Sequence, residues 1–417
     1  MSQQRLLERF ERYVRVDTTA RPNVDRYPSS PGQLELGRML VDELKAIGLS
    51  DATQDEHGIV LATVPSTVSD ANADTIPTIA FCAHLDTSPE APGRDVKPQV
   101  VRDYPGGDLV LPADPRQVIS VANNPELKGL RGRTLITSDG TTLLGADDKS
   151  GVAIIMEMAA RLTENPAIEH GPIRVVFTCD EEIGRGVDKL DLERVGAAVC
   201  YTLDGPGGHG IDVETFSADE ATITVRGVNI HPSIAKGKMV NAIRAAGLLI
   251  NRLPHDRLAP EVTEGREGFL HPHEVQGGVA EVRIQLLLRD FDTPKLADYA
   301  EQLRDVARAT EQDVPGVSVE VTVREQYRNM RDGLRRDPRA VAYAEEALAR
   351  LGHEPRRTSV RGGTDGSRLT EMGLPTPNLA SGQHQPHSLL EWACLEEMEE
   401  AVDWAVAIAQ RWVEAGS

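Results

Sequence analysis

Acidic residues gather where apolar segments of this sequence begin or end. In the stretch GADDKSG, Asp147 and Asp148 lie side by side between glycines, just before an apolar segment. Adjacent carboxylates repel each other unless a positive charge lies close to them. Taken alone, the pair is more typical of a helix cap than of a metal ligand, so its role depends on what the other segments supply.

Three short apolar runs are followed by side chains that can bind a metal. The runs are rich in β-forming residues and barely alternate, which is typical of strands buried on both faces of a mostly parallel sheet. Ligands of open α/β sheets gather beyond the carboxyl ends of such strands. The runs and the residues that follow them are 78–82 with His84 and Asp86, 173–178 with Glu181 and Glu182, and 197–203 with Asp204.

This collection of side chains predicts a metal centre with two ions. Imidazole and carboxylate groups without thiolates suit zinc, with manganese or cobalt as substitutes. Several carboxylates with only one or two histidines suit a site in which one carboxylate bridges two ions about 3.5–4 Å apart. Asp147 can be that bridge, while Asp148 turns away and caps the helix that follows.

The spacing of these residues indicates two further roles. His84 and Asp86 are two residues apart, so on a strand they project from the same face. Asp86 can therefore accept the proton on the second ring nitrogen of His84 and fix its tautomer. Glu181 and Glu182 are neighbours that point apart, so one can bind metal while the other acts as a general base toward a metal-bound water.

The hydrophobic pattern divides the chain into three parts. Residues 1–214 and 328–417 combine helical periodicity with buried strands, whereas residues 215–327 contain strands in which apolar and polar residues alternate. Alternation predicts strands with one solvent-exposed face. Their order is strand, helix, strand, strand, helix, strand, which is the split βαβ arrangement. We therefore predict an α/β catalytic domain with a mostly parallel sheet, interrupted by an inserted ferredoxin-like domain.

The overall composition argues against several classes of protein. The formal net charge of −20 and the isoelectric point near 5.0 disfavour nucleic-acid partners and anionic membrane surfaces. The N-terminal segment mixes charged with apolar residues, unlike a signal peptide, and no run of about 18 apolar residues occurs. The four cysteines show no paired spacing, so we expect a cytoplasmic protein without disulfides.

Nine motifs together carry a resemblance to a known family. They occur in one order along the chain, which resembles the two-zinc exopeptidases, in particular those that remove the N-terminal residue of tripeptides, from about residue 5 to 410. The motifs on which this resemblance depends are AHLDT, TLLGADDKSGVA, DEEIGRG, YTLDG, NIHPSIAKGKMVNA, PEVTEGREGF, RDFD, RGGTDGS and LPTPNL.

The resemblance implies a role for each residue of the centre. The pair His84 and Asp204 would hold one zinc ion, the pair Glu182 and His387 would hold the other, and Asp147 would bridge both, beside a cis bond to Asp148. In the same pattern Asp86 would orient His84, and Glu181 would be the general base.

The last zinc ligand lies in a stretch, GQHQPHSLLEW, that departs from the usual pattern of the family. Glu391 and Trp392 keep the expected spacing to His387, which we take as the ligand, with His384 as the alternative. Other histidines are expected to lie on the surface or in loops. These are His170, His209, His255, His271, His273 and His353.

Two more residues are candidates for contact with the substrate. Arg361 lies in a glycine-rich loop, and its guanidinium suits a bidentate grip on a peptide carboxylate, although a structural ion pair is the alternative. The resemblance implies that His231 contacts substrate and that the inserted domain is a lid that also forms a homodimer. We expect a zinc-dependent tripeptide aminopeptidase, with a related two-zinc dipeptidase or amino-acid deacylase as the alternative.

Overall fold

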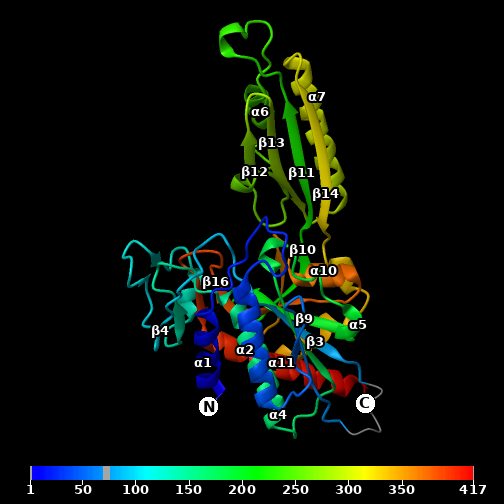
Figure 1. Ribbon diagram of the computed structural model, residues 1–417. Helices are drawn as coiled ribbons and strands as arrows, with labels where there is room; N and C mark the ends of the chain where they lie inside the picture. The colour runs from blue at the N-terminus through cyan, green and yellow to red at the C-terminus, as the bar shows by residue number, and fades with distance from the viewer. Residues whose placement is uncertain (1, 69–75, 417) are drawn as a thin grey trace. The chain divides into compact units, whose positions relative to one another are not determined.

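The computed structural model describes residues 2–68 and 76–416 and divides the chain into two compact units (Figure 1). The larger unit contains Met1–Val213, Asp332–Thr358 and Thr364–Ser417, and the smaller unit contains Glu214–Arg331 and Ser359–Gly363. The sequence analysis assigned the whole of 328–417 to the catalytic domain. In the structure Ser359–Gly363 groups with the smaller unit, because the Phe216 N–H donates a hydrogen bond to the Val360 carbonyl (3.1 Å).

An eleven-stranded mixed sheet forms the centre of the larger unit. Its main path runs β1-β2-β8-β3-β9-β16-β17-β7-β4, with β10 paired to β16 and β15 paired to β10. The middle strands β8, β3, β9 and β16 are parallel. The strands are β1 Thr53–Gln54, β2 Val60–Val64, β3 Ile79–His84, β4 Gln99–Val101, β7 Leu135–Thr137, β8 Ile173–Thr178, β9 Val199–Pro206, β10 Gly210–Thr215, β15 Arg356–Val360, β16 Asn378–His384 and β17 Trp392–Cys394. A separate two-stranded sheet consists of β5 Leu109–Val110 and β6 Val118–Ile119.

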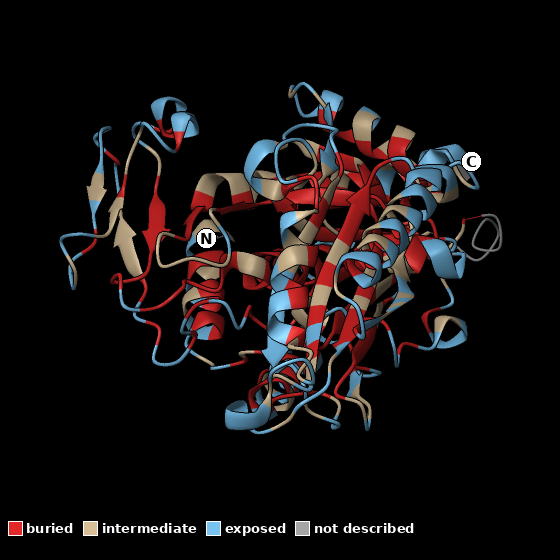
Figure 2. Cartoon of the chain, turned by 90° about the horizontal axis from the view of Figure 1, so that it is seen from above, coloured by how far each residue is buried: buried red, intermediate tan, exposed pale blue. Residues whose placement is uncertain are grey.

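Helices cover this sheet, and α4 packs against α1, α2 and α11 as well as against β3, β9 and β16. Residues such as Ile154, Ile155 and Met156 of α4 are completely buried, because helices and strands pack against this helix. Figure 2 shows buried residues in red through the centre of the molecule. The helices are α1 Ser2–Val14, α2 Pro31–Ile47, α4 Ala146–Glu164, α5 Leu192–Val195, α8 Arg331–Leu334, α9 Arg339–Arg350, α10 Asp365–Met372 and α11 Leu395–Gly416. Short 3-10 turns span Pro125–Gly129 and Glu181–Ile183.

The smaller unit is a four-stranded antiparallel sheet with two helices, as the alternating pattern predicted. Its strand order is β12-β13-β11-β14, and the chain order is strand, helix, strand, strand, helix, strand. Its apolar core lies between the sheet and the two helices. The elements are β11 Ser217–Arg226, α6 Ala242–Asn251, β12 Phe269–Gly277, β13 Glu281–Asp290, α7 Pro294–Asp313 and β14 Ser318–Tyr327, with 3-10 turns at Pro232–Ile234 and Pro260–Val262.

Both units together give the α/β architecture with a separate antiparallel sheet that the sequence predicted. All four cysteines are buried and free. Within residues 2–68 and 76–416, no helix combines the length and the apolar character that crossing a bilayer requires.

Candidate metal centre and active site

The parallel strands of the larger unit bring the expected ligands to one edge of the sheet. His84 is the last residue of β3 and pairs in register with Thr178, the last residue of β8. Glu181 and Glu182 follow in the 3-10 turn after β8. Asp204 lies inside β9, which continues three residues beyond the apolar run that predicted it. Strand register therefore explains why side chains about a hundred residues apart in sequence share one site.

A first group of potential ligands consists of His84, Asp147 and Asp204. The Nε2 atom of His84 lies 3.0 Å from Oδ1 of Asp147 and 3.8 Å from Oδ1 of Asp204. One ligand atom from each residue falls within 4.8 Å of the other two. The spacing is short enough for a single metal ion to contact all three.

A second group shares Asp147 with the first. The Nε2 atom of His387 lies 2.9 Å from Oε2 of Glu182 and 3.4 Å from Oδ2 of Asp147. Asp147 therefore directs one carboxylate oxygen toward His84 and the other toward His387. This is the arrangement that a carboxylate needs to bridge two metal ions.

The charges of the cluster also fit cations. Burial and the nearby charge of Asp147 raise the pKa of Glu182 to about 8, against the lowering effect of His387. Burial and Asp147 likewise raise the pKa of Asp204 to about 7. Oε1 of Glu182 is buried and has no hydrogen-bond partner among the described residues. Buried polar atoms nearly always have a partner, so this oxygen of Glu182 is suited to bind a metal ion.

The backbone around Asp147 is held by a residue that the sequence analysis used only to mark spacing. Oε2 of Glu391 accepts hydrogen bonds from the N–H groups of Leu144 (2.7 Å) and Gly145 (2.8 Å). Its Oε1 accepts one from the N–H of Asp147 at 3.0 Å. Nothing in the local sequence pattern reveals these contacts, because Glu391 lies far along the chain. Glu391 is therefore a positioning residue for the shared ligand.

Asp148 turns away from the ligand groups. The bond between Asp147 and Asp148 is cis, and both residues have non-helical backbone angles at the start of α4. Oδ1 of Asp148 accepts a hydrogen bond from the Gly151 N–H (3.2 Å), and its Oδ2 accepts one from the His84 N–H (3.1 Å). The side chain thus caps the regular part of the helix and ties it to the end of β3.

Asp86 lies close to His84 but makes its hydrogen bonds elsewhere. Its Oδ1 atom is 3.5 Å from Nδ1 of His84, whereas that nitrogen is 3.1 Å from the carbonyl oxygen of Asp86 itself. The carboxylate accepts hydrogen bonds from the N–H groups of Glu181 (3.0 Å) and Glu182 (3.1 Å). Asp86 therefore fixes the turn that carries both glutamates as well as lying against the imidazole.

Glu181 belongs to neither ligand group. Burial raises the pKa of its carboxyl group well above the usual value, with Asp365, Asp204 and Glu182 adding to the effect and His84 opposing it. A raised pKa is typical of a carboxylate that exchanges a proton during catalysis. Glu181 adjoins the candidate ligand Glu182 in sequence, in the same 3-10 turn.

The two candidate histidines near the end of the chain have different surroundings. His387 faces Asp147 and Glu182 as described. His384 places Nε2 2.7 Å from Oε2 of Glu397, and its ring stacks on Trp392 with centroids 3.7 Å apart. Of these two histidines, only His387 shares a group of potential ligands with Asp147 among the described residues.

The two candidate substrate-binding residues belong to the smaller unit, whereas all the ligand residues belong to the larger one. The Arg361 guanidinium stacks over the rings of Phe216 and Phe269, at 5.2 and 5.8 Å from their centroids. It donates hydrogen bonds to Oγ1 of Thr263 (3.0 Å) and to the Gly265 carbonyl (3.1 Å). No acidic partner within the described residues holds it in an ion pair, the alternative considered from sequence.

His231 stands in an exposed turn of the same smaller unit. Its Nδ1 atom lies 2.7 Å from Oγ of Ser233 and also accepts a hydrogen bond from the Ser233 N–H. The side chain thereby caps the 3-10 turn Pro232–Ile234. Its second ring nitrogen, Nε2, is not engaged in this cap.

Asp204 is positioned by two amide side chains that the sequence analysis missed. Oδ1 of Asn378 accepts a hydrogen bond from the Asp204 N–H (3.0 Å). Nε2 of Gln383 donates to the carbonyl (2.9 Å) and to Oδ1 (3.1 Å) of Asp204. Both residues lie on β16, which pairs with β9, so only the strand pairing reveals their function.

A sheet whose strand ends gather histidine and carboxylate side chains is typical of an α/β enzyme that binds metal ions at the carboxyl edge of its parallel strands. Peptidase family M20/M25/M40 matches residues 139–411, and the chain belongs to this family. It is 45% identical to the peptidase T of Geobacillus thermodenitrificans over 406 residues, which cover 97% of each chain. At such identity over nearly the whole length, the chain falls in the peptidase T branch and is a peptidase.

Solved structures agree with this assignment. The aminopeptidase PepT of Bacillus cereus is similar with a TM-score of 0.73 and 26% identity, covering 98% of each chain. A tripeptidase of Staphylococcus aureus is similar with a TM-score of 0.77 and 25% identity, covering 99% of each chain. The similarity therefore includes both units of the chain.

Proposed function

We propose that this protein is a zinc-dependent tripeptide aminopeptidase. The observation that carries the proposal is the position of Asp147, whose two oxygens face two separate groups of ligands. A half-buried glutamate outside both groups, Glu181, stands next to the proposed ligand Glu182. The names of the relatives, peptidase T, aminopeptidase and tripeptidase, support the substrate class.

The residues present fit two zinc ions. His84 and Asp204 would hold one ion, Glu182 and His387 the other, and Asp147 would bridge them. The unsatisfied oxygen of Glu182 and the mixture of imidazole and carboxylate donors support this assignment. Bound there, zinc would polarise the peptide carbonyl and lower the pKa of a bound water from that of bulk water to about 7.

Proton transfer in this proposal is the task of Glu181. Its carboxylate removes a proton from the attacking water and later delivers that proton to the departing amine. Asp86 keeps Glu181 in place through the hydrogen bond to its backbone N–H. Arg361 binds the carboxylate at the end of the peptide, since its guanidinium is held rigid by Phe216, Phe269 and Thr263.

The remaining expectations belong to the same proposal. His231 would contact the substrate, and the smaller unit would act as a lid through which two copies form a homodimer. The enzyme would work in the cytoplasm, without nucleic-acid or membrane partners. Analytical ultracentrifugation of the purified chain tests the dimer, which a monomer at all concentrations would exclude.

A peptide panel tests the function directly. The protein is treated with a chelator, assayed, supplied with zinc, and assayed again on di-, tri- and tetrapeptides and on acylated amino acids. We expect hydrolysis of tripeptides only, lost on chelation and regained with zinc. Faster hydrolysis of dipeptides or acylated amino acids would favour the alternative, a dipeptidase or deacylase of the same family.

A further inference from the structure

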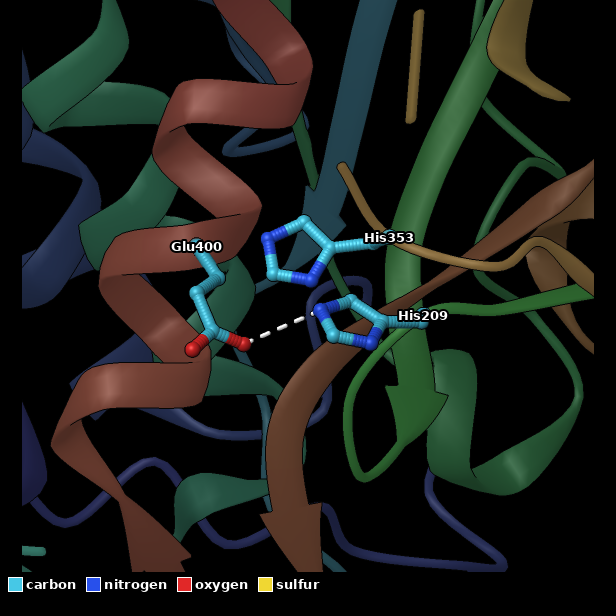
Figure 3. A group of neighbouring side chains, drawn as sticks. All are labelled: His209, His353 and Glu400. Atoms are coloured by element: carbon cyan, nitrogen blue, oxygen red, sulfur yellow. Dashed lines mark ion pairs between the residues drawn. The ribbon is translucent and has the colours of Figure 1, made fainter. Parts of the chain in front are cut away.

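A second group of metal-binding side chains lies in the larger unit and shares no residue with the centre described above. His209, His353 and Glu400 each offer one ligand atom, and these atoms lie within 4.8 Å of one another. Figure 3 shows the two imidazole rings beside each other, with the carboxylate of Glu400 reaching toward them from α11. The sequence analysis expected His209 and His353 to be surface or loop residues, so their convergence is a new observation.

The backbone that carries the two imidazoles is fixed. His209 lies in the turn between β9 and β10, and its carbonyl accepts a hydrogen bond from the Arg356 N–H (3.2 Å). His353 lies in the connection between α9 and β15, and its N–H donates to the Leu348 carbonyl (3.2 Å). The ring centroids of the two histidines are 4.0 Å apart. Both rings are thus presented together by two well-anchored segments.

Two of the potential ligand atoms lie at ion-pair distance from each other (Figure 3). Nε2 of His209 and Oε2 of Glu400 are 3.0 Å apart. Both atoms are buried, and apart from this ion pair neither has a polar partner among the described residues. In a tetrahedral zinc site with bonds of about 2.0–2.1 Å, neighbouring ligand atoms lie about 3.3 Å apart. The separation is therefore close to that of two ligands of one ion, and a cation would satisfy both atoms.

The other oxygen of Glu400 has a partner that orients the carboxylate. Nη1 of Arg133 donates a hydrogen bond to Oε1 (2.8 Å), which leaves Oε2 directed at the imidazoles. Ligating carboxylates in metal sites are commonly held in this way. Burial alone would raise the pKa of Glu400, but His209 and Arg133 lower it below its usual value. The carboxylate is therefore ionised at neutral pH and able to bind a cation.

We propose that His209, His353 and Glu400 form an additional site for one borderline transition-metal ion such as zinc. Two imidazole nitrogens and one carboxylate oxygen are a known zinc donor set, and they leave a position for water. Magnesium and calcium prefer oxygen ligands and are poor candidates. The ion would join the β9–β10 turn, the α9–β15 connection and α11. It would therefore stabilise the fold of the larger unit and leave peptide hydrolysis unchanged.

Metal analysis of the full-length holoenzyme tests the proposal. The wild-type protein and the His353→Gln variant are equilibrated against the same buffered free zinc, and bound zinc is measured by mass spectrometry. We expect His353→Gln to hold about one equivalent of zinc less per chain. We also expect that raising the free zinc increases the melting temperature of the wild type more than that of the variant.

Two further variants make the result decisive. His57→Gln removes an accessible histidine of the same unit outside the group and should keep the wild-type zinc content. His209→Asn serves if His353→Gln folds poorly, because His209 has φ +65° and asparagine tolerates that conformation. Turnover should be equal in all variants. Equal zinc content and equal zinc-dependent melting in the wild type and both site variants would overturn the proposal.

Discussion

Glu391 holds Asp147 by its backbone, since Oε1 of the glutamate accepts the N–H of the aspartate at 3.0 Å. The same carboxylate also accepts the N–H groups of Leu144 and Gly145. The buried side chain of Glu391 thus fixes the backbone just before Asp147, the residue that both ligand groups share. Burial raises the pKa of Glu391 to about 7, while these backbone hydrogen bonds oppose the shift.

Replacing this positioning residue should weaken metal binding without removing a ligand. Glu391→Gln keeps the size of the side chain but offers only one acceptor oxygen. Some of the hydrogen bonds that hold the backbone around Asp147 are therefore lost. We expect zinc affinity to fall about 10–100-fold, and activity to return in excess zinc. Competition with a chromogenic chelator measures the affinity. The control is Glu345→Gln, which removes the half-buried partner of the exposed Arg357 and should leave the affinity unchanged.

Replacing the proposed general base should separate chemistry from metal binding. Glu181→Gln cannot accept a proton, and we expect kcat for a tripeptide to fall by about 10²–10⁴-fold. Zinc content should stay at the wild-type value, because Glu181 lies outside both ligand groups. Steady-state kinetics and metal analysis of the same preparation check both statements. Near-normal turnover in this variant would remove Glu181 from the mechanism.

The two histidines of the GQHQPH segment should behave differently when each is changed to glutamine. His387→Gln removes the partner of Glu182 and Asp147, so both zinc content and turnover should fall sharply. His384→Gln changes a ring that faces Glu397 and Trp392, and both quantities should stay near wild type. Metal analysis and a tripeptide assay decide between them. The reverse result would make His384 the ligand.

His384 should contribute stability that depends on pH. Burial alone would lower its pKa, but Glu126 and Glu397 raise it above 6.5 overall. A group whose pKa is raised on folding stabilises the protein fully below its unfolded pKa, and the contribution is lost as pH rises through the folded value. The wild type should therefore have a higher free energy of unfolding than His384→Gln, and the difference between the two proteins should be larger at about pH 6 than at about pH 9. Urea titrations of both proteins measure this difference in unfolding free energy. A difference that grows with pH would contradict the stabilising role given to His384.

Arg361 should discriminate peptides by their C-terminal group. Arg361→Lys keeps the charge but loses the planar fork that binds a carboxylate through two hydrogen bonds. We expect KM for a free-acid tripeptide to rise about tenfold, corresponding to about 1.4 kcal/mol. The C-terminal amide of the same peptide should bind both proteins equally. A similar rise in KM for acid and amide would indicate that Arg361 only supports the loop of Thr263 and Gly265.

Local sequence patterns predicted the elements that lie in the centre of the fold. The run 173–178 became β8 with the same bounds, because residues such as Val175 and Phe177 are buried and must form a central strand. The ends of these runs also predicted where His84 and Glu182 lie, at the carboxyl edge of the sheet. A strand that is buried on both faces requires a nearly continuous run of apolar residues, so it can be recognised from the local sequence alone.

Features that depend on contacts between distant segments could not be predicted in this way. Asn378 and Gln383 hold Asp204 only because β16 pairs with β9. Ser359–Gly363 groups with the smaller unit because its backbone pairs with Phe216. His209, His353 and Glu400 come from three segments whose local patterns show only loops and a helix. These side chains come together only through tertiary packing, which cannot be predicted from any one short segment of the sequence.

The interruption of the larger unit has a consequence for how the protein emerges from the ribosome. Four of the predicted ligands, His84, Asp147, Glu182 and Asp204, are translated before the smaller unit begins at Glu214, whereas His387 is translated after Arg331. Most of the smaller unit is one continuous stretch and can fold as soon as it is synthesised. The nascent chain thus carries a complete antiparallel sheet while its peptide-cleaving machinery is still unfinished, and proteolytic competence arrives late in translation.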